Sequence, residues 1–134
     1  MEIKLKIESS LNSIERIELF LHDLTEKHLI NKCQYNSIYL ALNEAVNNAI
    51  QHGNKYDINK SVKITFQHVN NLYQFIVEDE GIGFDISKIQ DPTCNELLHK
   101  ESGRGIFIMK KYSDGVEFID KGNIIKLIFN IRGD

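Results

Sequence analysis

Residues 43–54 of this chain concentrate polar side chains with the chemistry of a reaction centre. If they form a helix, each residue advances by about 100°, so Glu44 and Asn48 project one turn apart on the same side. Asn47 and Gln51 fall beside them. A carboxylate can orient or deprotonate a nucleophile, and an amide oxygen suits one vertex of an octahedral magnesium ion. The spacing therefore predicts a helix face able to serve phosphate chemistry.

The other side of this predicted helix, expected from about Tyr35 to His52, is apolar. Glu44 and its neighbours could still be ordinary solvated side chains, but adjacent asparagines each cost a helix some tenths of a kcal/mol, which favours function. His52 could act as a base, although a histidine at a helix end is also favoured by the helix dipole. Gly53 and Asn54 are expected to cap the helix in the left-handed conformation. The side expected to pack on a sheet carries Leu42, Ala45, Val46, Ala49 and Ile50.

A second polar motif, from Glu78 to Phe84, follows an apolar run that is typical of a strand. It contains Gly81 and Gly83, which let the backbone approach a ligand closely. A Rossmann loop is excluded because no third glycine follows at the required spacing, and a P-loop because no Gly-Lys-Ser/Thr is present. A eukaryotic-type kinase is excluded because its catalytic-loop and metal-binding triplets are missing.

A third motif, from Ser102 to Met109, is expected to open a helix that runs from about Gly105 to Tyr112. Backbone N–H groups at a helix start attract anions, and Gly103 and Gly105 allow a phosphate to come close. Arg104 could pair with that phosphate or face solvent. The four residues from Ile106 to Met109 are expected to pack against the core.

In this order, the three motifs resemble the N, G1 and G2 boxes of the GHKL (histidine kinase-like) ATPases. The resemblance implies a site for ATP and Mg²⁺. Glu44 would be the general base or would align the attacking group, and Asn48 would bind the metal, with Asn47 as a further candidate near the nucleotide. Asp79 would accept a hydrogen bond from the exocyclic amine of adenine, a role that suits a group that only accepts. The remaining candidate contacts to the nucleotide are Gly81, Ile82, Gly83, Ser102, Gly103, Arg104, Gly105 and Ile106.

Within the superfamily, the chain is most similar to the stand-alone bacterial anti-sigma factor/serine-protein kinases. That resemblance implies binding of a sigma factor in one state, and phosphorylation of a serine on an antagonist protein (an anti-anti-sigma factor of the STAS type) in another. Some members carry a basic residue where this chain has Glu101. Two alternatives therefore stay open: a nucleotide-sensing binding module without kinase activity, and an orphan histidine-kinase catalytic domain.

The predicted elements do not alternate as βαβ units, so we expect an α+β fold with a mixed, mostly antiparallel sheet and helices on one face. This is the two-layer α/β sandwich, or Bergerat fold with three helices, that the resemblance implies. Strands are expected at residues 2–8, 61–69, 72–78, 115–120 and 124–131, and a helix follows Ser9 or Ser10. We expect one ATP-binding domain over residues 1–134, with an ATP lid at about 85–102.

Composition bounds the remaining possibilities. The formal charge of −3 over 134 residues argues against direct nucleic-acid binding. Neither a membrane-spanning stretch nor a signal peptide is recognisable, and Cys33 and Cys94 lack metal-site spacing, so we expect a cytoplasmic protein with reduced thiols. The alternating strand 2–8 would lie at a sheet edge, where strands invite pairing. We therefore expect a homodimer.

Overall fold

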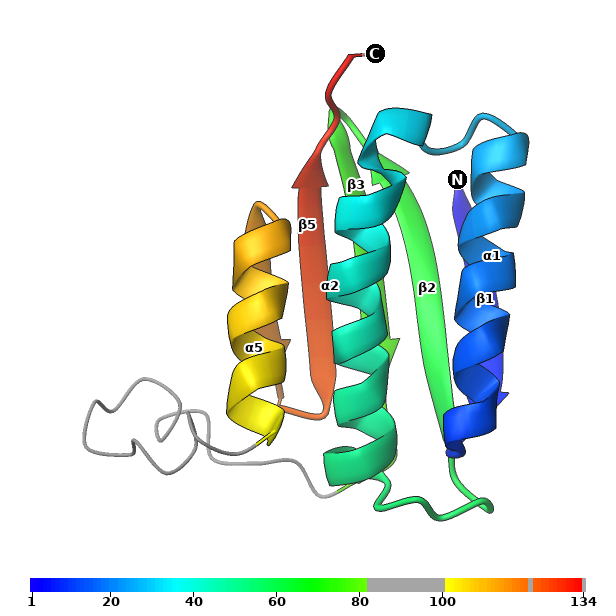
Figure 1. The fold of residues 1–134 in the computed structure, drawn as a ribbon, viewed down its shortest axis with the longest axis vertical. Helices are drawn as coiled ribbons and strands as arrows, with labels where there is room; N and C mark the ends of the chain where they lie inside the picture. The colour runs from blue at the N-terminus through cyan, green and yellow to red at the C-terminus, as the bar shows by residue number, and fades with distance from the viewer. Residues whose placement is uncertain (82–100, 121, 134) are drawn as a thin grey trace, which may run out of the picture.

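The computed structural model describes residues 1–81, 101–120 and 122–133. Five strands form one sheet in the order β1-β2-β3-β5-β4, and every neighbouring pair is antiparallel. Three helices cover one face of this sheet (Figure 1), which confirms the predicted two-layer sandwich. The strands are β1 (Glu2–Glu8), β2 (Ser61–Val69), β3 (Leu72–Glu78), β4 (Gly115–Ile119) and β5 (Ile124–Asn130), and the helices are α1 (Ile14–Glu26), α2 (Tyr35–Asn48) and α5 (Glu101–Tyr112).

The strands form because apolar residues alternate along them and turn toward the helices. Every second residue is buried along β3, and along β2 as far as Phe66. Phe66 and Phe75 are directly paired across these strands, with ring centroids 5.1 Å apart. Such cross-strand aromatic pairs stabilise a sheet and fix its register. The core at this level is completed by Val62, Ile64, Tyr73, Val77, Leu127 and Phe129.

Helices α1 and α2 each bury one row of apolar side chains that recur every third or fourth residue. In α1 the buried residues are Ile17, Leu21 and Leu24. A short 3-10 turn precedes the helix, and Ser10 caps it by accepting the backbone N–H of Asn12 at 3.3 Å. In α2 the predicted apolar side is fully buried. Its polar side therefore has a fixed orientation, away from the sheet.

Two local predictions were wrong. Helix α5 begins at Glu101 rather than Gly105, so the third motif lies inside the first turns of the helix. Phe107 is 64% exposed and does not face the core, whereas Gly105 and Met109 are buried. A helix can turn only one stripe inward, and here residues spaced by four define it. Ile82, Gly83, Cys94 and the greater part of the predicted lid lie outside the described residues.

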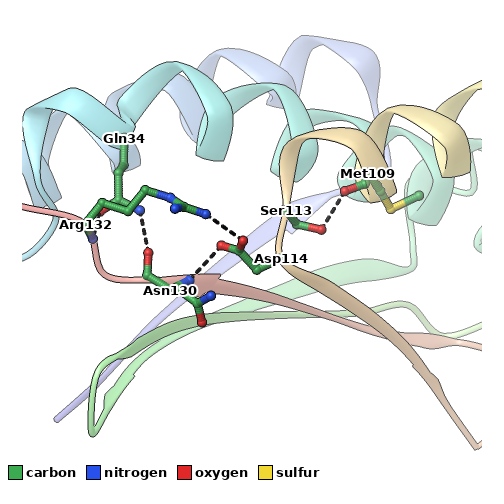
Figure 2. A network of polar contacts seen from close by, with 6 residues as sticks. All are labelled: Gln34, Met109, Ser113, Asp114, Asn130 and Arg132. Carbon is green, nitrogen blue, oxygen red and sulfur yellow. Dashed lines mark hydrogen bonds and ion pairs between the residues drawn. The ribbon is translucent and has the colours of Figure 1, made fainter.

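The end of the sheet near the β2–β3 turn is closed by a polar network (Figure 2). Gln34 donates to the carbonyl of Asn130 at 2.8 Å and accepts the backbone N–H of Arg132 at 2.9 Å. Asp114 accepts from the Asn130 backbone at 2.8 Å and from the Arg132 guanidinium at 2.7 Å. The network joins the start of α2, the chain after α5 and the end of β5. It lies at the end of the molecule opposite the end of α2 and the start of α5 (Figure 1).

Within the residues described, none of the helices has the length and apolar character that a bilayer crossing requires. Cys33 is exposed, and its sulfur lies 3.7 Å from the carbonyl oxygen of Gly133.

Candidate functional site

The first and third motifs meet where the end of α2 lies beside the start of α5 (Figure 1). Together they line a cavity of about 150 Å³. Helix α2 and the π turn after it (Ala49–Gly53) contribute Glu44, Asn47, Asn48, Gln51 and His52, while α5 contributes Arg104 and Gly105. The four side chains predicted to share one side of α2 therefore do so, because the buried stripe behind them fixes the rotation of the helix.

Glu44 and Gly105 lie next to each other where these two motifs meet. A Cβ atom built on Gly105 would lie 3.0 Å from Oε2 of Glu44. Glycine thus lets the first turns of α5 come against the carboxylate without crowding it. The half-buried Glu44 is held where the two helices converge, at the wall of the cavity.

Asn48 is the most buried polar residue of the cavity, at 8% exposure. No group of three or more His, Cys, Asp or Glu side chains able to hold a metal occurs in the described part of the chain. The donor chemistry of the cavity, an amide oxygen beside a carboxylate, nevertheless fits Mg²⁺, which prefers oxygen ligands and retains several waters. Asn48 would hold the metal together with phosphate oxygens.

Asp79 directly follows β3 and is 7% exposed. Its backbone N–H donates to the carbonyl of Asn123 at 2.9 Å, and its Oδ1 accepts the backbone N–H of Gly81 at 2.7 Å. Burial raises the pKa of this carboxyl, and the hydrogen bond from Gly81 partly opposes that rise. Among the described residues it has no salt bridge. A buried carboxylate of this kind is suited to accept a hydrogen bond from a ligand.

Two glycines make the space that Asp79 occupies. A Cβ atom on Gly53 would lie 2.3 Å from the Asp79 carboxyl group, and one on Gly81 would lie 2.2 Å from the carbonyl oxygen of Gly53. The prediction that Gly53 and Asn54 adopt the left-handed conformation is wrong. Asn54 has a φ of −86°, and the residues of this stretch with positive φ are Lys55 and Tyr56, at 52° and 61°. The chain reverses direction only after the π turn that ends at Gly53. This glycine is therefore needed for close packing and not for a left-handed backbone.

Sequence reasoning therefore missed Gly53 as a site residue, although it lies inside the first motif. The remaining predicted residues are distributed as follows. Arg104 is exposed at the cavity, Ser102 and Gly103 lie in the first turn of α5, and Ile106 is half-buried against the core. The exposed His52 lines the cavity. A larger hollow of about 750 Å³ lies between α1 and the start of α2, and its described lining contains none of the motif residues.

Two named proteins are similar to this chain over more than half of its length. Serine-protein kinase RsbW of Bacillus subtilis is 28% identical over 122 residues, which cover 85% of this chain and 75% of that protein. An anti-sigma F factor of Clostridium perfringens (strain SM101) is 33% identical over 88 residues, 64% of this chain and 63% of that protein.

A solved structure with RsbU and RsbW domains, from Mycobacterium tuberculosis, matches 98% of this chain with a TM-score of 0.67. The identity is 12% and the match spans 32% of that longer chain, so this likeness shows the fold. The model of the family described as "Histidine kinase-like ATPase domain" matches residues 7–129. The chain therefore belongs to the histidine kinase-like ATPase domain family.

Proposed function

We propose that this chain is an ATP-dependent protein serine kinase that also acts as an anti-sigma factor. The observation that carries the proposal is the cavity where Glu44 and Asn48 from α2 meet Gly105 from α5. The names of the relatives, serine-protein kinase and anti-sigma F factor, support the same function. One ATP-binding domain over residues 1–134 fits this function, since a single sheet extends from β1 to β5.

In the proposed reaction, the serine oxygen of a partner protein attacks the γ-phosphorus of ATP. A new P–O bond forms, the bond to the leaving ADP oxygen breaks, and Glu44 takes the hydroxyl proton or orients the hydroxyl. Asp79 would accept a hydrogen bond from the exocyclic amine of adenine, and backbone N–H groups at the start of α5 would face phosphate oxygens. Asn48 would hold Mg²⁺, which supplies positive charge to the phosphates when bound.

Arg104 gives the cavity one cation, which suits the terminal phosphate. The chain as a whole is anionic, with a formal charge of −3. Local positive charge, a metal ion and backbone N–H groups would therefore be needed to hold an anionic nucleotide. Arg104 would supply the positive charge, Asn48 would hold the metal ion, and the first turn of α5 would supply the backbone N–H groups.

The proposed partners are a sigma factor and a serine-bearing antagonist of the STAS type. A second copy of the chain is a further proposed partner, because β1 is an edge strand whose exposed residues alternate with half-buried ones. Analytical sedimentation at high protein concentration is expected to show a dimer. Monomer alone under those conditions would contradict the dimer without touching the kinase proposal.

A radiolabel assay with [γ-³²P]ATP, Mg²⁺ and a serine-bearing antagonist tests the kinase directly. Labelled phosphoserine in the partner is the expected result. The family resemblance implies a basic residue in some members at the position of Glu101, and this favours a second candidate, a nucleotide sensor without transfer. The sensor would label no partner, but its affinity for one would change between ADP and ATP in a pull-down. Label on a histidine of a separate protein would instead indicate a histidine-kinase catalytic domain.

A further inference from the structure

Asn54 is a buried amide, 1% exposed, at the end of the first motif. Its Nδ2 donates to the hydroxyl of Ser9 at 2.7 Å and to the carbonyl of Ser61 at 3.0 Å. Its Oδ1 accepts the backbone N–H of Glu80 at 2.7 Å. One side chain thus joins the segment after β1, the start of β2 and the loop that follows β3.

The partners fix the orientation of this amide. A backbone N–H can only donate and a carbonyl can only accept, so the flipped amide would lose the bonds to both Glu80 and Ser61. All three bonds exist only in the orientation described. An asparagine at this position therefore specifies where the backbone of residue 80 lies.

Residue 80 stands between two residues that are proposed to contact the nucleotide. Its neighbours are Asp79 and Gly81, which are hydrogen-bonded to each other and packed against Gly53. The Glu80 side chain adds a second anchor, because its carboxylate accepts from the backbone N–H and the hydroxyl of Ser61. The backbone hydrogen bond from Ser61 is the main reason that the pKa of Glu80 lies below its usual range.

We propose that Asn54 is a positioning residue for base recognition, which holds the 79–81 loop so that the Asp79 carboxylate meets adenine and not guanine. This inference rests on the proposed nucleotide site. Asn54 does not touch the nucleotide in this arrangement. It acts through the backbone of Glu80, and its loss would let Asp79 shift within its tight contact with Gly53.

The test compares ADP with GDP in the presence of Mg²⁺, by calorimetry on the full chain. The wild type is expected to prefer ADP. Two variants remove the hydrogen bond to Glu80: Asn54→Ala, and the milder Asn54→Ser, whose side chain is too short to reach it. In both, the ratio of the affinities for ADP and GDP should fall about three- to tenfold, which is the loss expected for one hydrogen bond. Asn54→Asp keeps an oxygen for the Glu80 N–H and should retain more of the ratio than either.

Asn31→Ala is the matched control. The Asn31 amide donates to Gln34 and to the carbonyl of Arg132 at the far end of the sheet, so its loss should lower thermal stability and leave the ratio unchanged. A purely structural role for Asn54 would reduce binding of both nucleotides alike.

Three outcomes overturn the inference, and they differ from failure of the site itself. The first is a ratio unchanged in both Asn54→Ala and Asn54→Ser, and the second is an equal fall in Asn31→Ala. The third is a wild type that binds ADP and GDP equally. A wild type that binds neither nucleotide would overturn the proposed function as well.

Discussion

The two ends of the sheet each bury polar groups, but they use them differently. At the end shown in Figure 2, both carboxylate oxygens of Asp114 accept protein donors, one from the Asn130 backbone and one from the Arg132 guanidinium. At the motif end, Asp79 accepts the N–H of Gly81, is more deeply buried and has no salt bridge among the described residues. The first carboxylate is neutralised within the protein, and the second is available for a ligand.

The surroundings of the two carboxylates differ in the same way. Asp79 is approached by glycines whose missing side chains leave room for it, and the neighbouring cavity lies between α2 and α5. Asp114 is instead an exposed residue, and it forms an ion pair with the exposed Arg132. A carboxylate that is paired within the protein helps to hold its elements together, whereas a buried charge without a counter-ion costs stability. Variants at the two ends should therefore separate function from stability.

The largest expected effect is on phosphoryl transfer. Glu44→Ala should lower the transfer rate by about 10²- to 10⁴-fold, the contribution typical of a positioned acid or base, while ATP affinity stays close to wild type. Asn48→Ala should also weaken magnesium-dependent ATP binding, because it removes a ligand of the metal in the ground state. Radiolabel transfer and calorimetry measure the two effects. Transfer at the wild-type rate in Glu44→Ala would remove the proposed role of that carboxylate.

Asp79→Asn should weaken ADP binding by about 10- to 100-fold, since a charge-assisted hydrogen bond contributes about 1.5–3 kcal/mol. The same change should raise thermal stability at pH 7. Burial raises the pKa of Asp79 in the folded protein. Above that raised pKa the ionised carboxylate lowers the free energy of unfolding. This loss of stability disappears as the pH falls through the raised pKa toward the ordinary pKa of an aspartate. Melting curves should therefore separate wild type and variant at neutral pH and converge in acid.

The control for this pair is Asp114→Asn. It should lower thermal stability and leave ADP binding unchanged, because Asp114 pairs with Arg132 far from the cavity. Protonation of Asp79 should also weaken ADP binding in the wild type as pH falls through its raised pKa. Equal responses of Asp79→Asn and Asp114→Asn in both assays would erase the distinction between the two ends.

Gly53→Ala should destabilise the protein. A Cβ atom 2.3 Å from the Asp79 carboxyl group would force the loop or the π turn to move, and overpacking of this kind costs about 1–3 kcal/mol. Chemical denaturation should show the loss, and ADP binding should fall with it. Gly115→Ala is the matched control, since its Cβ would meet Ile128 at an ordinary 3.6 Å. A Gly115→Ala variant as damaged as Gly53→Ala would refute this steric explanation.

The smallest effect is expected at the paired end. Arg132→Ala removes an ion pair whose arginine side chain is 62% exposed, so the free energy of unfolding should fall by no more than about 1 kcal/mol. ADP affinity should not change. A denaturant titration and a nucleotide titration on the same variant give both values. A clear change in ADP affinity would show that the two ends are energetically coupled.

Periodicity and turn signals predicted the sheet strands and the first two helices, because apolar residues recur every second position in strands and every third or fourth in helices. It also placed Glu44, Asn47, Asn48 and Gln51 on one side of α2, since helix geometry fixes the angle between neighbours. The order of the three motifs then predicted the family, which comparison confirmed. These properties are local or repeat along the chain, so the sequence carries them directly.

Contacts between distant segments were decided by tertiary structure. Gly53 is separated from Asp79 by the whole β2–β3 hairpin, and no local rule indicates that a Cβ there would collide with a carboxylate. Asn54 is similarly separated from Glu80 and Ser9, and Glu44 from Gly105. The first residue of helix α5 could not be predicted from the sequence either. Glycine disfavours helix interiors, whereas the packing of α5 against α2 stabilises the helix at its glycines. Sequence therefore determined which side chains share a face, and the fold decided which faces meet.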